Sequence, residues 1–328
     1  MLARWLDGRL PGPSMAITAD RVHGGASHRL YRITRGEAAY ALRMPAQHRN
    51  DPTSHTLQRE IRLLAALRGA GIPHAKPVAH ESYDELLGAP FLLVDWIDGF
   101  TPRAPLPPDC ETPFRRRTIA ESMIDALTQI SNVDWRAIGL DGFGKPDGFL
   151  DRQVDRWLGQ LQRAQLRPLP HVDDLCGWML ANKPKTQRAA LIHGDYTFLN
   201  VICHRHGPPE VAAVVDWESA TLGDPLLDLG GLLACWEEPD ESPSHATYFD
   251  WHAMPPRLEM AERYARATGL DVTHLRFYMV LALFKFAVIM EGWYSLYVAG
   301  RSSLATHAAM ETGVPGLLER AAMFADLR

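Results

Sequence analysis

The chain has 328 residues, of which 46% are hydrophobic and 22% charged, with a formal charge of −5 at pH 7. This balance is typical of a folded globular protein and excludes a disordered or collagen-like chain. A negative net charge excludes a globally basic surface, so we expect no nucleic-acid partner.

The four cysteines form no C-x-x-C pair and no disulfide framework, which favours a reducing, cytoplasmic location. The first residues lack the apolar segment of a signal peptide. The most apolar stretch, residues 277–290, contains Lys285 and falls short of the ~20 apolar residues that a membrane span requires. We therefore expect a cytoplasmic protein with no membrane partner, and a buried helix at this stretch.

The first third of the chain has a strand-rich pattern. Segments with strand character, separated by turns or loops, predict strands at residues 17–22, 29–34, 38–43 and 91–94. Leu57, Ile61 and Leu64 recur at helical spacing and predict a helix from residue 56. The Pro-rich residues 102–108 predict a loop.

The remainder of the chain is mostly helical by pattern. Apolar stripes predict helices near residues 119–130, 150–161, 255–268, 272–298 and 315–326, with a β interruption at residues 190–193, 200–204 and 210–215. We therefore predict an α+β fold with a β-rich N-lobe, residues 1–97, and a mainly helical C-lobe, residues 98–328. The cleft between two such lobes is the default place for a ligand.

The strongest functional signal is His193-Gly194-Asp195, followed by Asn200 and, after a predicted hairpin, by Asp216. The spacing of Asp195 and Asn200 is that of a kinase catalytic loop, in which the Asp meets the acceptor hydroxyl and the Asn binds Mg²⁺. The hairpin returns the chain so that Asp216 lies beside Asn200. Two oxygen ligands, completed by triphosphate oxygens and water, suit Mg²⁺. The structural alternative is that Asp195 caps a turn and Asp216 ends a strand.

These motifs resemble those of the aminoglycoside phosphotransferase and choline kinase-like superfamily. The resemblance runs from about residue 17 to the C-terminus and extends to Gly223-Asp224-Pro225 and Asp228-Leu229-Gly230. More narrowly, Leu42-Arg43 and Phe277-Tyr278 resemble the branch of kinase-like domains fused to some acyl-CoA dehydrogenases. The resemblance implies a two-lobed, protein-kinase-like fold and ATP-dependent phosphoryl transfer to an alcohol group.

The resemblance also implies roles in holding the nucleotide phosphates. Gly24, Gly25 and Ser27 lie where the family's loop covers the phosphates, although a plain hairpin turn is an equal alternative. Arg43 occupies the place of the kinase lysine, with Glu60 as its ion-pair partner. Arg keeps a permanent charge and binds phosphate bidentately. The alternative for this pair is an ion pair at the surface.

Two further roles follow from the resemblance. The backbone of Asp95 and Ile97 matches the interlobe hinge and would bind the adenine edge, with ATP as the nucleotide and GTP as the alternative. Asp228 matches a buried helix carboxylate that supports the catalytic loop through backbone N–H groups.

We predict a small-molecule kinase whose acceptor hydroxyl belongs to a hydroxy acid or its acyl derivative, as the branch resemblance favours. One alternative is an aminoglycoside- or choline-type kinase, for which the acidic run at residues 237–241 is the only hint; a solvated loop is the favoured interpretation of this run. Another is a catalytically silent nucleotide-binding regulatory module. Lys285 either snorkels to the surface or faces the cleft and meets an anionic acceptor.

Two other patterns are set aside. Residues 139–146 match the P-loop motif at every position except the last. Pro146 occupies the position at which the motif requires Ser or Thr to bind Mg²⁺. Cys203, His204 and His206 lack the staggered spacing and the fourth ligand of a zinc site, so an exposed turn is the better interpretation.

Overall fold

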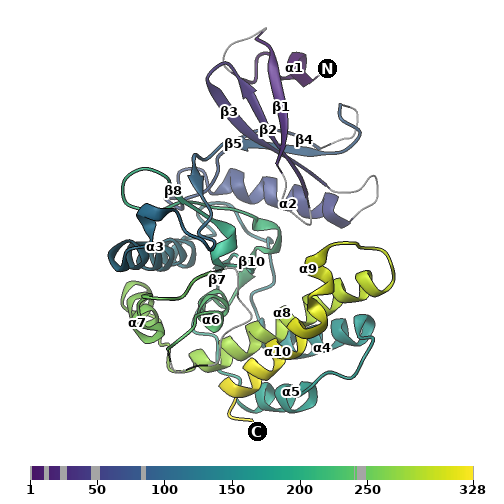
Figure 1. Cartoon of the computed structure of the whole chain (residues 1–328), viewed down its shortest axis with the longest axis vertical. Coiled ribbons are helices and arrows are strands. Elements are labelled where there is room, and N and C mark those ends of the chain that lie inside the picture. Colours follow the sequence, from purple (N-terminus) through teal and green to yellow (C-terminus); the bar gives the residue numbers. More distant parts are fainter. Residues whose placement is uncertain are drawn as a thin grey trace. The chain divides into compact units, whose positions relative to one another are not determined.

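A computed structural model describes residues 2–10, 15–22, 28–45, 52–82, 86–239, 241 and 249–327. The chain divides into two compact units (Figure 1). Unit 1 comprises Met1–Thr101, Trp135–Leu140 and Asn200–Ala220, and unit 2 comprises Pro102–Asp134, Asp141–Leu199 and Thr221–Arg328. The predicted α+β class is confirmed, with an N-terminal antiparallel sheet and a helical C-terminal part. The lobe boundary at residue 97 stays a prediction.

A five-stranded antiparallel sheet of order β1-β2-β3-β5-β4 forms the first part of unit 1. Its strands are β1 (Ile17–Val22), β2 (His28–Arg35), β3 (Ala38–Pro45), β4 (Pro77–Glu81) and β5 (Phe91–Asp95). Four of them were predicted. The pattern does not predict β4, because this edge strand begins at a proline and none of its residues is fully buried.

The two faces of the sheet bury different side chains. Tyr40, Leu42 and Met44 alternate along β3 and pack into a core cluster with Leu6, the last residue of α1 (Leu2–Leu6). Because strand side chains alternate between faces, Arg43 lies on the opposite face. That face meets α2 (Pro52–Ala66), which contacts β3, β4 and β5 (Figure 1).

A three-stranded sheet of order β6-β8-β9 completes unit 1. Its strands are β6 (Gly99–Phe100), β8 (Val201–His204) and β9 (Val211–Val214), followed by the 3₁₀ helix η4 (Trp217–Ser219), which contacts α2. Gly99 is required at its position because a Cβ there would lie 2.3 Å from the carbonyl oxygen of Cys203. The predicted hairpin that leads to Asp216 is confirmed.

Unit 2 is a group of helices with one pair of short strands. The helices are α3 (Pro113–Asn132), α4 (Gln153–Ala164), α5 (Val172–Ala181), α6 (Leu226–Ala234), α7 (Arg257–Thr268), α8 (Leu275–Val298), α9 (Ala305–Ala308) and α10 (Met310–Phe324). The strands are β7 (Ala190–Ile192) and β10 (Thr221–Gly223), and the 3₁₀ helices are η1 (Pro108–Cys110), η2 (Leu150–Arg152) and η3 (Phe198–Asn200), whose last residue belongs to unit 1.

Helix α8 is central to unit 2, because it packs against α10, α6, α4 and α5. Its residues from Phe277 to Val288 are buried, so the long apolar stretch is a core helix, as predicted. Helix α6 approaches it closely: a Cβ at Gly230 would lie 2.6 Å from the backbone of Tyr278. Within the described ranges, no helix has the length and apolarity to span a membrane.

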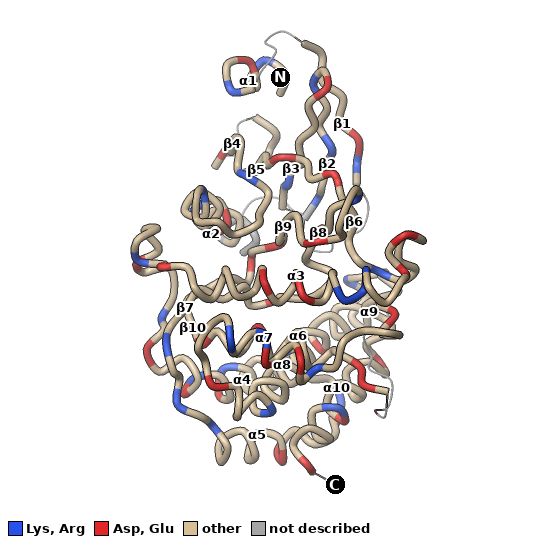
Figure 2. Tube along the Cα trace, turned by 90° about the vertical axis from the view of Figure 1, so that its left-hand side faces the viewer, with Lys and Arg blue, Asp and Glu red and all other residues tan. Residues whose placement is uncertain are grey.

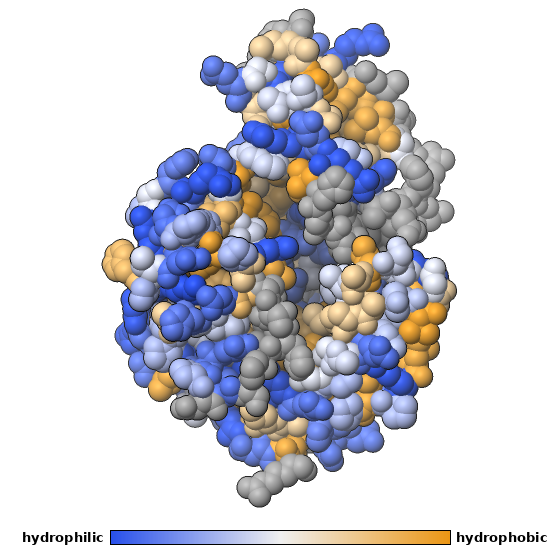
Figure 3. All heavy atoms as spheres, viewed as in Figure 1, coloured by the Kyte–Doolittle hydropathy of each residue, from blue (hydrophilic) through white to orange (hydrophobic). Residues whose placement is uncertain are grey.

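The exposed surface of unit 2 carries both signs of charge. Along α3 three consecutive arginines, Arg115–Arg117, come first and the acidic residues Glu121 and Asp125 follow (Figure 2). Arg117 pairs with Glu121 of the same helix and with Glu259 of α7. Over α3 and α7 the surface is mostly hydrophilic (Figure 3). All four cysteines are free.

Candidate active site

Asp228 of α6 anchors the loop that follows β7 in unit 2, residues 193–196. The Asp228 carboxylate accepts hydrogen bonds from the backbone N–H groups of His193, at 2.6 Å, and Gly194, at 2.8 Å. Gly194 has φ +81°, a conformation that favours glycine. The predicted supporting role of Asp228 is confirmed. Burial raises the pKa of Asp228, while the two N–H groups oppose this shift.

The residues after Asp195 are anchored to the core of unit 2. The Tyr196 hydroxyl donates to the carbonyl of Met123 on α3, at 2.7 Å. Phe198 packs against Phe249, with ring centroids 4.3 Å apart, and against Trp236. Residues on both sides of Asp195 are therefore fixed, which is the pre-organisation that a positioned catalytic carboxylate requires.

Lys285 approaches the same segment from α8. Its side chain is buried, so the snorkelling alternative is wrong, and its ammonium donates to the carbonyl of Gly194. A small cavity of about 10 Å³ lies there, lined by Gly194, Asp195, Asp228 and Lys285 among others. That volume holds about one water molecule. Whether Lys285 meets an acceptor stays a prediction.

In unit 1, Arg43 joins two carboxylates. One guanidinium nitrogen bonds the buried Glu60, and the other lies 3.0 Å from Asp216. The predicted Arg43–Glu60 pair therefore exists, and it is buried, so the surface alternative is wrong. Burial lowers the pKa of Arg43, but Glu60 and Asp216 outweigh it and raise the pKa overall. Burial raises the pKa of Glu60, and Arg43 opposes that shift.

Asn200 and Asp216 come together at the end of the β8–β9 hairpin. Val201 pairs with Val214, and the N–H of Val215 donates to the carbonyl of Asn200 at 2.9 Å. Their predicted proximity is confirmed at the level of the backbone. Asp216 has φ 65° and ψ 60°, a left-handed conformation that non-glycine residues adopt at a cost and that recurs at functional sites.

The chemistry of these two residues fits Mg²⁺. An amide oxygen and a carboxylate oxygen are hard ligands, and two protein oxygens leave places for phosphate and water. The side chain of Asp216 is 37% exposed, so its carboxylate is open to solvent beside Arg43. Asn200 and Asp216 therefore stay the candidate metal ligands.

The backbone around Asp95 has two engaged N–H groups and one open N–H group. The N–H of Asp95 donates to the carbonyl of Lys76 at 3.0 Å, and that of Trp96 donates to Ala39 at 3.2 Å. Among the described residues, no acceptor is recorded for the N–H of Ile97. The N–H of Ile97 is therefore available within the described residues, and the binding of an adenine edge by the backbone of Asp95 and Ile97 stays a prediction.

The predicted phosphate loop, Gly24, Gly25 and Ser27, lies outside the described residues. Residues 139–146 form turns and lack the strand–loop–helix context of a P-loop. Cys203 is buried while His204 is exposed, so these side chains do not converge. No cluster of three or more His, Cys, Asp or Glu side chains suited to a metal occurs in the part of the chain that is described.

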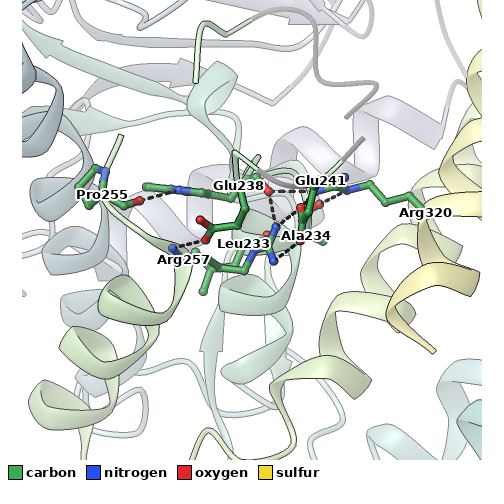
Figure 4. A network of polar contacts seen from close by, with 8 residues as sticks. Leu233, Ala234, Glu238, Glu241, Pro255, Arg257 and Arg320 are labelled. Atoms are coloured by element: carbon green, nitrogen blue, oxygen red, sulfur yellow. Dashed lines mark hydrogen bonds and ion pairs between the residues drawn. The ribbon is translucent and has the colours of Figure 1, made fainter. Parts of the chain in front are cut away.

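The acidic run at residues 237–241 has structural partners (Figure 4). Glu238 accepts a hydrogen bond from the N–H of Arg257, and Glu241 pairs with both Arg257 and Arg320. Burial acts to raise the pKa of Glu241, but the two arginines outweigh it and lower the pKa. At least two acids of this run therefore stabilise the fold, and a plain solvated loop does not describe them.

The sequence patterns did not predict the contact of Arg43 with Asp216 or the partners of Asp224. The pairing of Arg43 with Asp216 joins positions 173 residues apart, and no local pattern signals it. The buried Asp224 accepts a hydrogen bond from Tyr278 at 2.9 Å and caps α6 through the N–H of Leu226. The Asp-Pro pair at the start of a helix was the available signal for that cap.

The sequence and the fold match known proteins. A family model described as "Phosphotransferase enzyme family" (APH) matches residues 18–266. Acyl-CoA dehydrogenase family member 10 of Mus musculus is 31% identical over 314 residues, which cover 93% of this chain and 29% of that relative. The chain thus spans less than a third of that relative's length. The relationship to proteins named acyl-CoA dehydrogenase agrees with the predicted branch.

Two solved structures share the fold. A putative aminoglycoside phosphotransferase from Ralstonia eutropha JMP134 superposes with a TM-score of 0.85 and 25% identity, covering 99% of this chain and 97% of that chain. The ADP-bound aminoglycoside phosphotransferase APH(2'')-Ib has a TM-score of 0.58 and 18% identity, covering 95% of each chain. The latter likeness concerns the fold alone.

Proposed function

Because the chain belongs to the APH phosphotransferase enzyme family, we propose that it is a small-molecule kinase. It transfers the γ-phosphate of ATP to a hydroxyl group of the acceptor. One observation carries this proposal: the carboxylate of Asp228 accepts hydrogen bonds from the backbone N–H groups of His193 and Gly194, the two residues before Asp195. A carboxylate on a segment so fixed is suited to orient an acceptor hydroxyl and take its proton.

The nucleotide phosphates would be bound by residues of unit 1. Asn200 and Asp216 would hold Mg²⁺, which neutralises phosphate charge when bound. Arg43 would contribute a permanent positive charge to the phosphates while remaining paired with Glu60. The carbonyl of Asp95 and the N–H of Ile97 would select the adenine edge. This selection favours ATP over GTP, since guanine presents a different donor and acceptor pattern.

The acceptor that we propose is a hydroxy acid or its acyl derivative. The relationship to a protein named acyl-CoA dehydrogenase supports acyl chemistry. The acidic run gives little support to a polycationic aminoglycoside, because Glu238 and Glu241 are engaged by Arg257 and Arg320. The two arginines neutralise Glu241, whereas Glu238 accepts from the backbone N–H of Arg257 and keeps its charge, so one negative charge fewer is available to an aminoglycoside.

A turnover assay over a chosen panel tests this proposal. The panel contains short hydroxy acids with the hydroxyl on C2, C3 or C4, each as the free acid and as the CoA thioester, with kanamycin and choline for comparison. We expect Mg²⁺-dependent ADP formation with members of the hydroxy-acid set only, and its loss in Asp195→Asn. ADP formation with kanamycin or choline alone would contradict the acceptor class. Nucleotide binding without turnover on any member would favour the regulatory alternative.

A further inference from the structure

Lys285 is a buried cation on a helix that is otherwise apolar around it. The residue is 8% exposed and lies within the buried stretch of α8 from Phe277 to Val288. An ammonium group in such a place is costly unless charge and hydrogen bonds compensate it. A buried lysine of this kind needs a reason, and a packing role would be served better by Leu or Met.

The compensation comes from the segment that carries Asp195. The Lys285 ammonium donates to the carbonyl of Gly194, while Asp228 accepts from the N–H groups of His193 and Gly194. Gly194 is therefore bonded on its N–H side by α6 and on its carbonyl side by α8. These two opposed contacts fix the left-handed conformation at Gly194, φ +81°, from which the chain enters Asp195.

Lys285 has charged neighbours of both signs. Asp195 and Asp228 attract the ammonium, and Arg156 on α4 opposes them. His193, two residues before Asp195, interacts electrostatically with Asp228. The cavity that Lys285 shares with Gly194, Asp195 and Asp228 has a volume of about 10 Å³, which is room for about one water molecule and less than the carboxylate of an acceptor requires.

We propose that Lys285 is a positioning residue, which holds the Gly194 carbonyl and presents its charge to Asp195 so that the carboxylate meets the acceptor hydroxyl in the correct orientation. This role rests on the proposed kinase activity. It differs from direct binding of an anionic acceptor, because its effect falls on the rate of transfer and not on the affinity for the acceptor.

Steady-state kinetics separate the two roles. Lys285→Met keeps the side-chain length and removes the charge, Lys285→Gln keeps a hydrogen-bond donor, and Lys185→Met removes an exposed lysine as the matched control. With the best acceptor of the panel, we expect Lys285→Met to lower kcat about 10²-fold, as a small displacement of a catalytic group does. The KM values for ATP and for the acceptor should stay within about twofold, and Lys285→Gln should lose less kcat than Lys285→Met. A raised acceptor KM with normal kcat, or normal values of both, would overturn the proposal.

Hydrogen–deuterium exchange tests, without any acceptor, whether Lys285 restrains the backbone around Gly194. Lys285→Met should increase deuterium uptake in peptides that cover residues 193–196, whereas Lys185→Met should not. Unchanged uptake would overturn the positioning role even if the enzyme turns over. Increased deuterium uptake in Lys285→Met, together with no phosphorylation of any panel member by the unmodified protein, would support the contact between Lys285 and Gly194. That result would contradict the proposed kinase function instead. If Lys285→Met fails to fold, the same comparisons are made with Lys285→Gln.

Discussion

The guanidinium of Arg43 on β3 lies 3.0 Å from the carboxylate of Asp216, 173 residues further along the chain. The same guanidinium neutralises Glu60, which is 1% exposed. Arg43 is therefore the link between a buried carboxylate of α2 and the carboxylate that we propose as a metal ligand. In unit 1 these contacts bring together residues from β3, α2 and the end of the β8–β9 hairpin.

Replacing Arg43 should lower the free energy of unfolding more than replacing its buried partner Glu60. Arg43→Met leaves the buried Glu60 without its cation, which costs about 3–5 kcal/mol when a buried pair is broken. The double variant Arg43→Met/Glu60→Gln should recover most of this loss, because no charge then remains buried. Urea denaturation of the two single variants and the double variant measures the coupling. Additive losses would show that the pair is not a unit.

Replacing Asp216 should weaken Mg²⁺-dependent nucleotide affinity more than replacing Asn200. Asp216→Asn removes a full negative charge at constant size, whereas Asn200→Ala removes a neutral oxygen. Calorimetric titration of ATP with and without Mg²⁺ measures both effects. An unmodified protein that binds ATP equally well with and without Mg²⁺ would argue against the metal site.

The buried Asp228 should make stability depend on pH in a defined direction. Its pKa is raised by burial, so its contribution to stability is present below the ordinary value of 3.8 and is lost as pH rises through the folded-state pKa. The difference in unfolding free energy between the unmodified protein and Asp228→Asn should therefore shrink as pH rises. Urea midpoints from about pH 4 to about pH 7 measure it. A difference that grows with pH would contradict the raised pKa.

Glu241 should act on stability and not on the acceptor. Glu241→Gln weakens the ion pairs to both Arg257 and Arg320, and we expect a lower Tm with unchanged acceptor KM. Glu319→Gln, an exposed change on α10, removes the same charge as a control. A raised KM for kanamycin or choline in Glu241→Gln alone would restore the acidic run as an acceptor-binding element.

Local patterns predicted those parts of the molecule that local chemistry determines. Turn residues and alternation located β1, β2, β3 and β5, and helical spacing located α2, α3 and α8. The spacing from Asp195 to Asn200, with the hairpin after it, predicted that Asn200 and Asp216 would meet.

What remained hidden depends on distant residues or lacks a pattern. The hairpin strand β4 is only partly buried, and α6 carries two glycines, so neither element has a clear periodic signature. The partner of Lys285 is a backbone carbonyl 91 residues away, and backbone groups leave no trace in side-chain patterns. The sequence pattern left two alternatives for Lys285, the surface or the cleft. In the structure the side chain is buried and its ammonium donates to the carbonyl of Gly194.

The most direct test of the account follows the phosphoryl group itself. ATP labelled with ¹⁸O on the γ-phosphate is incubated with Mg²⁺ and the hydroxy-acid panel, and the products are analysed by mass spectrometry. We predict that an acceptor gains one labelled phosphoryl group, and that Asp195→Ala slows this transfer by ~10²–10⁴ while it still binds ATP. Labelled inorganic phosphate with no phosphorylated acceptor, or equal transfer by Asp195→Ala, would contradict the assignment of Asp195 as the catalytic base of a small-molecule kinase.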